Sequence, residues 1–315
     1  MDSNRLNRRR LIQVLAGLPV ATCLLPACAS SGSPAAARPA GPALRRFYVD
    51  GRYGQIHVYR AEPDIPAARR QHPLMCFHPT AVSGNYYRDF MLEMGRDRTV
   101  LAMDTPGYGR SDRPPEPQPM SGLAGAAADT LDALGYGNNG RGAVDVLGYH
   151  TGVFIATELA VLRPDLVRRL VLPGIAYYPP GEERQRLYDE NAKPKPLTED
   201  GSGVMDIWKF WVGNRTEGVS LERGAEHFAD HLQSGPYSWW AYHSVFSYAA
   251  EERLPLVKQP VLVPNTHGSL EEQTRAAAAL FPNVQLLEMP ELHHGIFDVG
   301  VERLSEVTRK FLDAE

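Results

Sequence analysis

Two histidines stand at positions where an imidazole could carry out chemistry. His150 is the centre of Gly-Tyr-His-Thr-Gly at 148–152, which follows the apolar run 144–147 and leads into the apolar stretch 153–162. His294 lies in Leu-His-His-Gly at 292–295, a few residues after the last short apolar run. An imidazole of ordinary pKa, about 6.5, is largely neutral at pH 7 and can act as a nucleophile or a general base. A pocket that holds both rings would suit acyl transfer or acid–base chemistry.

The glycines around His150 predict a sharp turn from a strand into a helix. Gly148 and Gly152 lie two residues before and two residues after the histidine. At such a turn the central side chain projects into a pocket, and the flanking residues approach so closely that a β-carbon would clash. The N-terminus of the following helix also points backbone N–H groups at an anion that forms beside the exposed residue. We therefore expect His150 to face a pocket opposite His294.

Composition excludes several classes of protein. The chain has 315 residues, with 33 Lys and Arg against 37 Asp and Glu, so its formal net charge is −4. A hydrophobic fraction of 43% and a charged fraction of 22% are typical of a folded globular protein. Because no basic patch follows the first ten residues, we expect no nucleic-acid partner. No histidine and carboxylate spacing suggests a metal site, so we expect neither a metal ion nor an organic cofactor.

Residues 1–28 have the pattern of an export signal, with a basic start that includes Arg8 and Arg9 and an apolar stretch at 11–25. Asn-Arg-Arg-Arg-Leu-Ile-Gln at 7–13 resembles a twin-arginine signal, so we expect the twin-arginine translocase as a partner during export. Leu-Pro-Ala-Cys at 25–28 resembles a lipobox, in which Cys28 would be acylated, and plain cleavage nearby is the alternative. We expect a periplasmic or cell-surface protein that meets the membrane only through such an anchor.

The rest of the chain alternates between apolar runs and helical patterns. Residues 29–43, rich in Ala, Pro and Ser, predict a tether. Residues 47–50 and 55–59 flank a turn at Gly51 and Gly54 and predict an opening hairpin. Short apolar runs of the kind found in buried parallel strands then occur at 74–77, 100–103, 144–147, 170–172, 261–263 and 284–287. Helical patterns lie between most of these runs, as in a doubly wound α/β sheet. We expect this core at 44–176 and 255–315, with a helical cap at 177–254 that holds all four tryptophans.

Four motifs in order resemble the α/β-hydrolase superfamily, in particular its cap-bearing branch with epoxide hydrolases and haloalkane dehalogenases. They are His-Pro-Thr at 78–80, Asp-Thr-Pro-Gly-Tyr-Gly-Arg-Ser at 104–111, and the segments 148–152 and 292–295. The resemblance spans residues 44–314. It implies a mostly parallel eight-stranded sheet with helices on both faces and a cap over the ligand-binding edge. It also implies that His294 is the general base and that the backbone N–H groups of Thr80 and Thr151 form an oxyanion hole.

Two residue types depart from this family pattern. The exposed residue of the turn is expected to be Ser, Cys or Asp, and here it is His150. The position of the carboxylate that orients the base falls on Gly268 and Ser269. This leaves Glu271 and Glu272 as the nearest candidates for that role, with Glu182 a more distant one.

The sequence predicts a hydrolase that cleaves an ester, lactone or similar acyl bond of a small apolar molecule. His150 would attack the acyl carbon to form an acyl-imidazole, which water then hydrolyses. His78, Trp239 and Trp240 are the residues expected to line the substrate pocket. One alternative is lyase or isomerase chemistry by the two imidazoles, which would share one proton near neutrality. Another is a non-catalytic protein that binds a ligand in the same pocket.

Overall fold

A computed structural model describes residues 41–63, 71–138, 140–194 and 198–314 of the chain. The predicted export signal, with Cys28, and the predicted tether up to residue 40 lie outside the described residues. None of the helices in these described ranges is both long enough and apolar enough to cross a bilayer.

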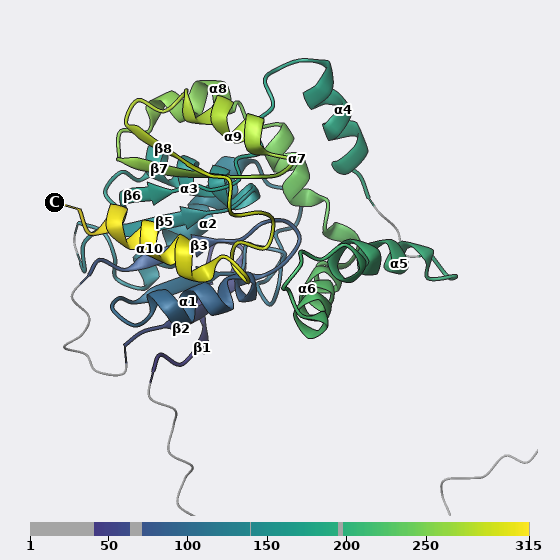
Figure 1. Ribbon diagram of the computed structural model, residues 1–315, viewed down its shortest axis with the longest axis horizontal. Coiled ribbons are helices and arrows are strands. Elements are labelled where there is room, and N and C mark those ends of the chain that lie inside the picture. The colour runs from purple at the N-terminus through teal and green to yellow at the C-terminus, as the bar shows by residue number, and fades with distance from the viewer. Residues whose placement is uncertain (1–40, 64–70, 139, 195–197, 315) are drawn as a thin grey trace, which may run out of the picture. The chain divides into compact units, whose positions relative to one another are not determined.

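One eight-stranded sheet organises the fold (Figure 1). Its strands are β1 (Arg45–Gly51), β2 (Gly54–Ala61), β3 (Leu74–Phe77), β4 (Val100–Met103), β5 (Val144–Gly148), β6 (Val167–Val171), β7 (Val261–Thr266) and β8 (Val284–Met289). They lie in the order β1-β2-β4-β3-β5-β6-β7-β8. The pairs β1–β2 and β2–β4 are antiparallel, and all other neighbours are parallel. This confirms the predicted mostly parallel sheet.

The continuous apolar runs become strands that are covered on both faces, with one exception. Every residue of β3, β4 and β5 is buried. The run 284–287 predicts the same for β8, but this strand lies at the edge of the sheet and Leu286 is 37% exposed. An edge strand has a neighbour on one side only, so its outer residues lack the cover that a central strand receives.

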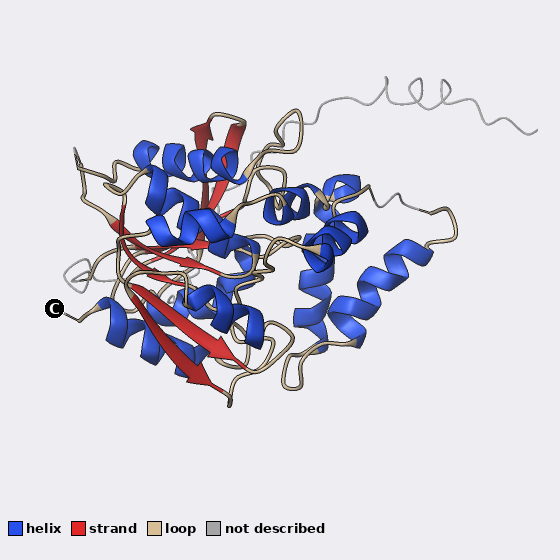
Figure 2. Ribbon diagram, turned by 90° about the horizontal axis from the view of Figure 1, so that it is seen from above, coloured by secondary structure: helices blue, strands red, loops and turns tan. Residues whose placement is uncertain are grey.

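Helices pack on both faces of the sheet (Figure 2). The helices α2 (Met120–Ala133), α3 (Thr151–Leu162) and α9 (Glu271–Ala278) contribute to the hydrophobic cluster on one face. The helices α1 (Arg88–Met94) and α10 (Val301–Leu312) contribute to the cluster on the other face. The apolar stripes of these helices bury the two faces of the sheet, which is the layered arrangement of an α/β fold.

The segment between β6 and β7 is helical and forms the cap. Its elements are α4 (Glu182–Asn191), α5 (Ser202–Trp208), the π-helical turn η4 (Lys209–Gly213), α6 (Leu221–Gln233), η5 (Gly235–Tyr237), α7 (Trp240–Phe246), α8 (Ala250–Arg253) and η6 (Leu254–Leu256). Helix α6 begins at a serine N-cap, since Ser220 Oγ accepts the Arg223 N–H at 3.1 Å. Its buried side meets the core through Asp230, which accepts a hydrogen bond from Ser83 Oγ at 2.6 Å.

Candidate active site

The turn between β5 and α3 contains His150 in a strained conformation. β5 ends at Gly148 and α3 begins at Thr151, so only Tyr149 and His150 make the turn. The His150 backbone has φ 51° and ψ −113°, and among the described residues no other non-glycine residue has a positive φ. Strain of this kind persists only where the surrounding structure imposes it. The geometry is the one expected of a turn that presents His150 to a pocket.

Packing around the turn leaves room only for glycine on both sides of His150. A β-carbon on Gly152 would lie 1.8 Å from the carbonyl oxygen of Phe77. A β-carbon on Gly148 would lie 2.2 Å from the carbonyl oxygen of Gly152. Real β-carbons do not approach other atoms so closely, so either substitution would force the strand and the helix apart.

Thr80 and Thr151 lie next to each other beside this turn. Thr80 follows β3, Thr151 is the first residue of α3, and their Oγ1 atoms are 2.6 Å apart. In the part of the chain that the structure describes, no hydrogen bond uses the backbone N–H of either threonine. The first N–H groups of a helix have no partner within the helix. Both N–H groups are therefore available to an oxyanion, as the sequence suggests.

His150 and His294 line one cavity of about 380 Å³. Loops after the strands supply Pro79, Thr80, Tyr149, Ser269 and Gly295, and the cap supplies Phe210, Trp211, Asn214, Arg215, Thr216, Val219, His227 and Tyr242. The cavity therefore lies between the cap and the strand ends, where ligands bind in open α/β sheets.

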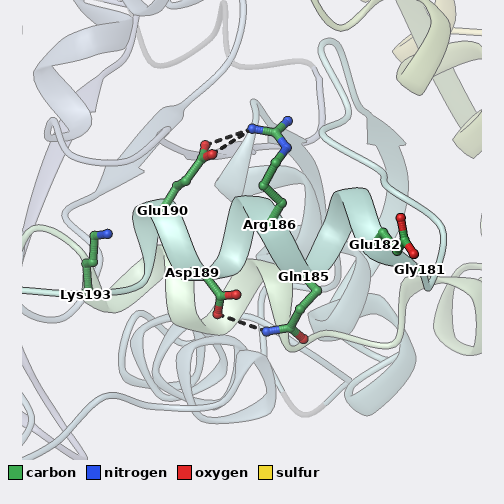
Figure 3. Close-up of a pocket in the computed structure, with 7 residues that line it drawn as sticks. All are labelled: Gly181, Glu182, Gln185, Arg186, Asp189, Glu190 and Lys193. Carbon is green, nitrogen blue, oxygen red and sulfur yellow. Dashed lines mark hydrogen bonds and ion pairs between the residues drawn. The ribbon is translucent and has the colours of Figure 1, made fainter.

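A larger hollow of about 780 Å³ runs along α4 and has different surroundings (Figure 3). Its lining comes from residues 181–193 alone, where Arg186 pairs with Glu190 and Gln185 bonds to Asp189 on the exposed helix surface. Such pairs one turn apart are typical of a solvated helix. We therefore assign the site to the cavity beside His150.

Both imidazoles of this cavity are neutral near pH 7. Burial lowers the pKa of His150 to about 3, and the neighbouring His294 acts in the same direction. Burial, followed by the influence of His293, lowers the pKa of His294 as well. Both shifts favour neutral rings near pH 7 over the shared proton that the sequence predicts. A neutral imidazole keeps a lone pair that can attack a carbonyl carbon or accept a proton from water.

No carboxylate among the described residues forms a hydrogen bond with His294. Its Nε2 lies 3.5 Å from Ser269 Oγ, and a β-carbon on Gly268 would lie 3.1 Å from the same nitrogen. Glu271, the predicted orienting residue, instead accepts hydrogen bonds from His267 Nδ1 at 2.9 Å and from Arg275 at 3.2 Å. This corrects the role given to Glu271, because its place in the first turn of α9 directs it to residues one turn before and after it.

His78 does not line the cavity and has a structural role. Its side chain is buried, and its Nε2 accepts the Thr105 N–H at 2.9 Å. The other nitrogen, Nδ1, then carries the proton and donates it to the carbonyl of Pro79 at 2.9 Å. With both ring nitrogens bonded, His78 joins the loops after β3 and β4 rather than contacting substrate. This corrects its predicted place in the pocket.

Trp239 and Trp240 also lie away from the cavity lining. Their rings pack against each other, and Trp240 packs edge-on against Tyr237 with 5.2 Å between ring centroids. The aromatic wall comes instead from Phe210, Trp211 and Tyr242. The concentration of tryptophan in 177–254 signals an aromatic cap, but only the packing of η4 and α7 decides which rings face the cavity.

Sequence reasoning missed the charged group that ties the cap to the cavity wall. Asp298 lines the cavity and accepts hydrogen bonds from Arg223 Nε at 2.6 Å and from His227 Nε2 at 3.3 Å. Burial alone would raise the pKa of Asp298, but the His227 hydrogen bond and the Arg223 charge lower it overall. Arg223 also donates to the carbonyls of Asn85 and Tyr86 at 3.0 Å. Arg223 and Asp298 are 75 residues apart, so no local pattern could have paired them.

Comparison with known proteins gives the family. No family model matches the chain. A poly(3-hydroxyalkanoate) depolymerase of Ectopseudomonas oleovorans is 33% identical over 253 residues, which cover 77% of this chain and 85% of that protein. The chain belongs to the α/β-hydrolase superfamily. This α/β-hydrolase also matches the polyketide synthase ThaQ of Burkholderia thailandensis, at 27% identity over 247 residues.

The extent of these matches differs between proteins. The match to the polyketide synthase covers 74% of this α/β-hydrolase, but the chain spans only 11% of that synthase. Among solved structures, the enol-lactonase of Burkholderia xenovorans LB400 aligns with a TM-score of 0.66 over 85% of this chain and 100% of that one. At 14% sequence identity, this likeness shows the fold alone.

Proposed function

We propose that this α/β-hydrolase cleaves an ester, lactone or related acyl bond of a small molecule with an apolar body. The observation that carries the proposal is a neutral imidazole on a strained turn, beside two backbone N–H groups that have no partner among the described residues. The aromatic wall of the cavity suits an apolar acyl or alcohol part. The similarity to a protein named as a poly(3-hydroxyalkanoate) depolymerase also supports this class of bond.

In the first half of the proposed reaction, a ring nitrogen of His150 attacks the acyl carbon. A nitrogen–carbon bond forms, and the Thr80 and Thr151 N–H groups stabilise the oxyanion of the tetrahedral intermediate. When this intermediate collapses, the bond to the alcohol oxygen breaks. The alkoxide takes the proton of the other ring nitrogen of His150, which leaves an alcohol and a neutral acyl-imidazole.

In the second half, His294 accepts a proton from water, and the resulting hydroxide adds to the acyl carbon. Collapse of this second intermediate breaks the nitrogen–carbon bond and releases the acid. The departing imidazole regains a proton from protonated His294, so both rings return to their neutral state. This route needs no base to activate the nucleophile, and the nucleophile therefore works without a carboxylate behind His294.

Turnover of short-chain p-nitrophenyl esters tests the proposal. We expect His150→Ala to lower kcat/KM at least 100-fold, His294→Ala to slow release of the acyl group, and the exposed control His72→Ala to match the unaltered protein. Mass spectrometry of His294→Ala after brief exposure to the ester should show the acyl group on His150. Equal rates in all four proteins would eliminate the assignment.

One observation favours a second candidate, a ligand-binding protein without catalysis. The place of the orienting carboxylate is filled by Gly268 and Ser269. This candidate predicts that a small ester raises the melting temperature without being hydrolysed, so the same substrates separate the two functions.

We further propose export through the twin-arginine translocase to the periplasm or cell surface, with the mature chain either acylated at Cys28 or cleaved nearby. The pattern of residues 1–28 supports this proposal. Cell fractionation of the double variant Arg8→Lys, Arg9→Lys should show cytoplasmic retention. Labelling with a fatty-acid analogue should distinguish acylation, which Cys28→Ser would abolish, from plain cleavage.

A further inference from the structure

Arg215 is an exposed residue that lines the cavity containing His150 and His294. We infer that Arg215 binds a carboxylate that the substrate carries in addition to its acyl bond. The inference rests on the proposed function for the reaction itself, but it makes a separate claim about which molecules the cavity selects.

The guanidinium is held in place by its own loop. Arg215 lies between η4 and α6, and it donates from Nε to the Val219 carbonyl at 3.0 Å and from Nη1 to the Val212 carbonyl at 2.8 Å. A β-carbon on Gly224 would lie 3.4 Å from Arg215 Cδ, so the aliphatic part of the side chain packs closely on α6. A group that is already ordered loses little entropy when a ligand binds.

Arg215 keeps donors for a ligand. Across the described ranges, no hydrogen bond uses its Nη2, and Nη1 makes a single bond although it carries two protons. Both N–H groups of Nη2 and one of Nη1 are therefore available to a ligand. A planar guanidinium edge matches the two oxygens of a carboxylate, which is the bidentate geometry that gives strong charge-assisted hydrogen bonds.

The charge of Arg215 is not neutralised within the cavity. No carboxylate of the described residues lies within 4.0 Å of its guanidinium, although Glu222 is near enough to interact with its charge. Asp298, which lines the same cavity, is bonded to Arg223 and His227. Both His150 and His294 are neutral near pH 7, as argued above. Arg215 therefore offers a positive charge at the cavity wall, in a chain whose formal net charge is −4.

The loop that carries Arg215 lies close to His294, the proposed base. Thr216, the next residue, packs against Gly295, where a β-carbon would lie 3.2 Å from Thr216 Cβ and Oγ1. Gly295 directly follows His294, so the Arg215 loop lies beside the proposed base. A carboxylate held there would leave the rest of the molecule to extend along the aromatic wall towards His150. The substrate class is therefore a small ester or lactone with an apolar body and one carboxylate.

The test compares a matched pair of probes, 3-phenylpropionate and its neutral amide 3-phenylpropionamide, by isothermal titration calorimetry. We expect the unaltered protein to bind the carboxylate more tightly than the amide, with an advantage that shrinks at 0.5 M salt. Arg215→Gln should weaken carboxylate binding about ten-fold or more and change amide binding less than about two-fold. The carboxylate affinity of Arg215→Lys should lie between those of the unaltered protein and Arg215→Gln. The lysine ammonium keeps the positive charge but not the planar pair of N–H donors that a guanidinium offers.

The control is Arg45→Gln, which removes the same charge from an exposed position on the edge strand β1 and should leave both affinities unchanged. A urea denaturation midpoint for each variant verifies folding. Equal binding of the two probes by the unaltered protein, or unchanged carboxylate binding in Arg215→Gln, overturns the inference. Because binding is measured without turnover, carboxylate selectivity with no hydrolysis of any ester would reject the proposed reaction and keep the Arg215 site.

Discussion

Protonation of His150 should destabilise the folded protein at acid pH, and this prediction tests the environment on which the proposed chemistry depends. In the folded state, burial lowers the pKa of His150 from 6.5 to about 3, with His294 acting in the same direction. In the unfolded chain the ring is solvated and its pKa returns to about 6.5. Because the folded-state pKa is the lower one, protons favour the unfolded chain. The contribution of His150 to stability is therefore complete above pH 6.5 and is lost progressively as the pH falls towards 3.

The size of the effect follows from these two pKa values. At pH 7.5 His150 is almost fully deprotonated in both the folded and the unfolded state. Its protonation therefore lowers the free energy of unfolding by less than about 0.1 kcal/mol. At pH 5 His150 is mostly protonated in the unfolded chain but not in the folded protein. The free energy of unfolding is therefore lower by about 2 kcal/mol. Water that enters the cavity would screen part of the imidazolium charge. We therefore expect the free energy of unfolding to fall by between about 1 and 2 kcal/mol at pH 5.

The assay is urea denaturation of the unaltered protein and of His150→Gln at pH 7.5 and pH 5. Glutamine is neutral at both pH values, so the variant lacks the pH-dependent change in stability that His150 contributes. The other buried histidines are present in both proteins, so their contributions cancel when the two are compared. The free energy of unfolding should fall between the two pH values by about 1 to 2 kcal/mol more in the unaltered protein than in the variant. The exposed control His72→Gln should behave like the unaltered protein. A difference below about 0.5 kcal/mol would falsify the claim that His150 is held neutral by burial.

Three further outcomes follow from the geometry of the site. The rate of acyl-group release, measured as kcat where that step limits turnover, should fall as the pH decreases through the lowered pKa of His294, with an inflection below 6.5 and a flat profile from pH 7 to 8.5. An inflection above 7 would contradict a neutral base. Gly152→Ala should lower the free energy of unfolding by about 3 kcal/mol or more, because its β-carbon would meet a backbone oxygen at 1.8 Å. Gly213→Ala, whose β-carbon would meet Lys209 at an ordinary 3.5 Å, is the matched control, and equal effects would refute the packing argument. Ser269→Asp should raise the pKa of His294 in a histidine NMR titration, because Ser269 Oγ already lies 3.5 Å from its Nε2; an unchanged pKa would mean that this side chain points away in solution.

The sheet was the most predictable part of the fold. Each of the six apolar runs that predict buried strands overlaps a strand of the structure, since a strand covered on both faces must be apolar along its whole length. The hairpin predicted at 47–50 and 55–59 is the antiparallel pair β1–β2. The prediction was wrong only in the burial of β8, where Leu286 is exposed. Apolar character shows that a residue can be buried, but the position of a strand in the sheet decides whether a neighbour covers it.

The turn at His150 was readable from the sequence because the glycines that permit it stand within five residues, although Gly152 itself lies against Phe77 of the neighbouring strand β3. A bend from a strand into a helix requires small residues at fixed distances along the chain, and Gly148 and Gly152 satisfy that requirement within five residues. The roles of Glu271, His78, Trp239 and Trp240 were not readable in the same way. Each depends on which distant element lies opposite the side chain, and in each case that neighbour was not the one expected.

The sequence by itself determined the alternation of strands and helices, the strained turn and the two histidines that face the same cavity. Only the tertiary structure decided that both rings are neutral, that no described carboxylate bonds to His294, and that Arg215 and Asp298 line the same cavity. The physical reason is the range of the forces involved. Backbone sterics and hydrophobic periodicity act between residues a few positions apart, whereas desolvation and charge pairing depend on the cap helices that close over the sheet.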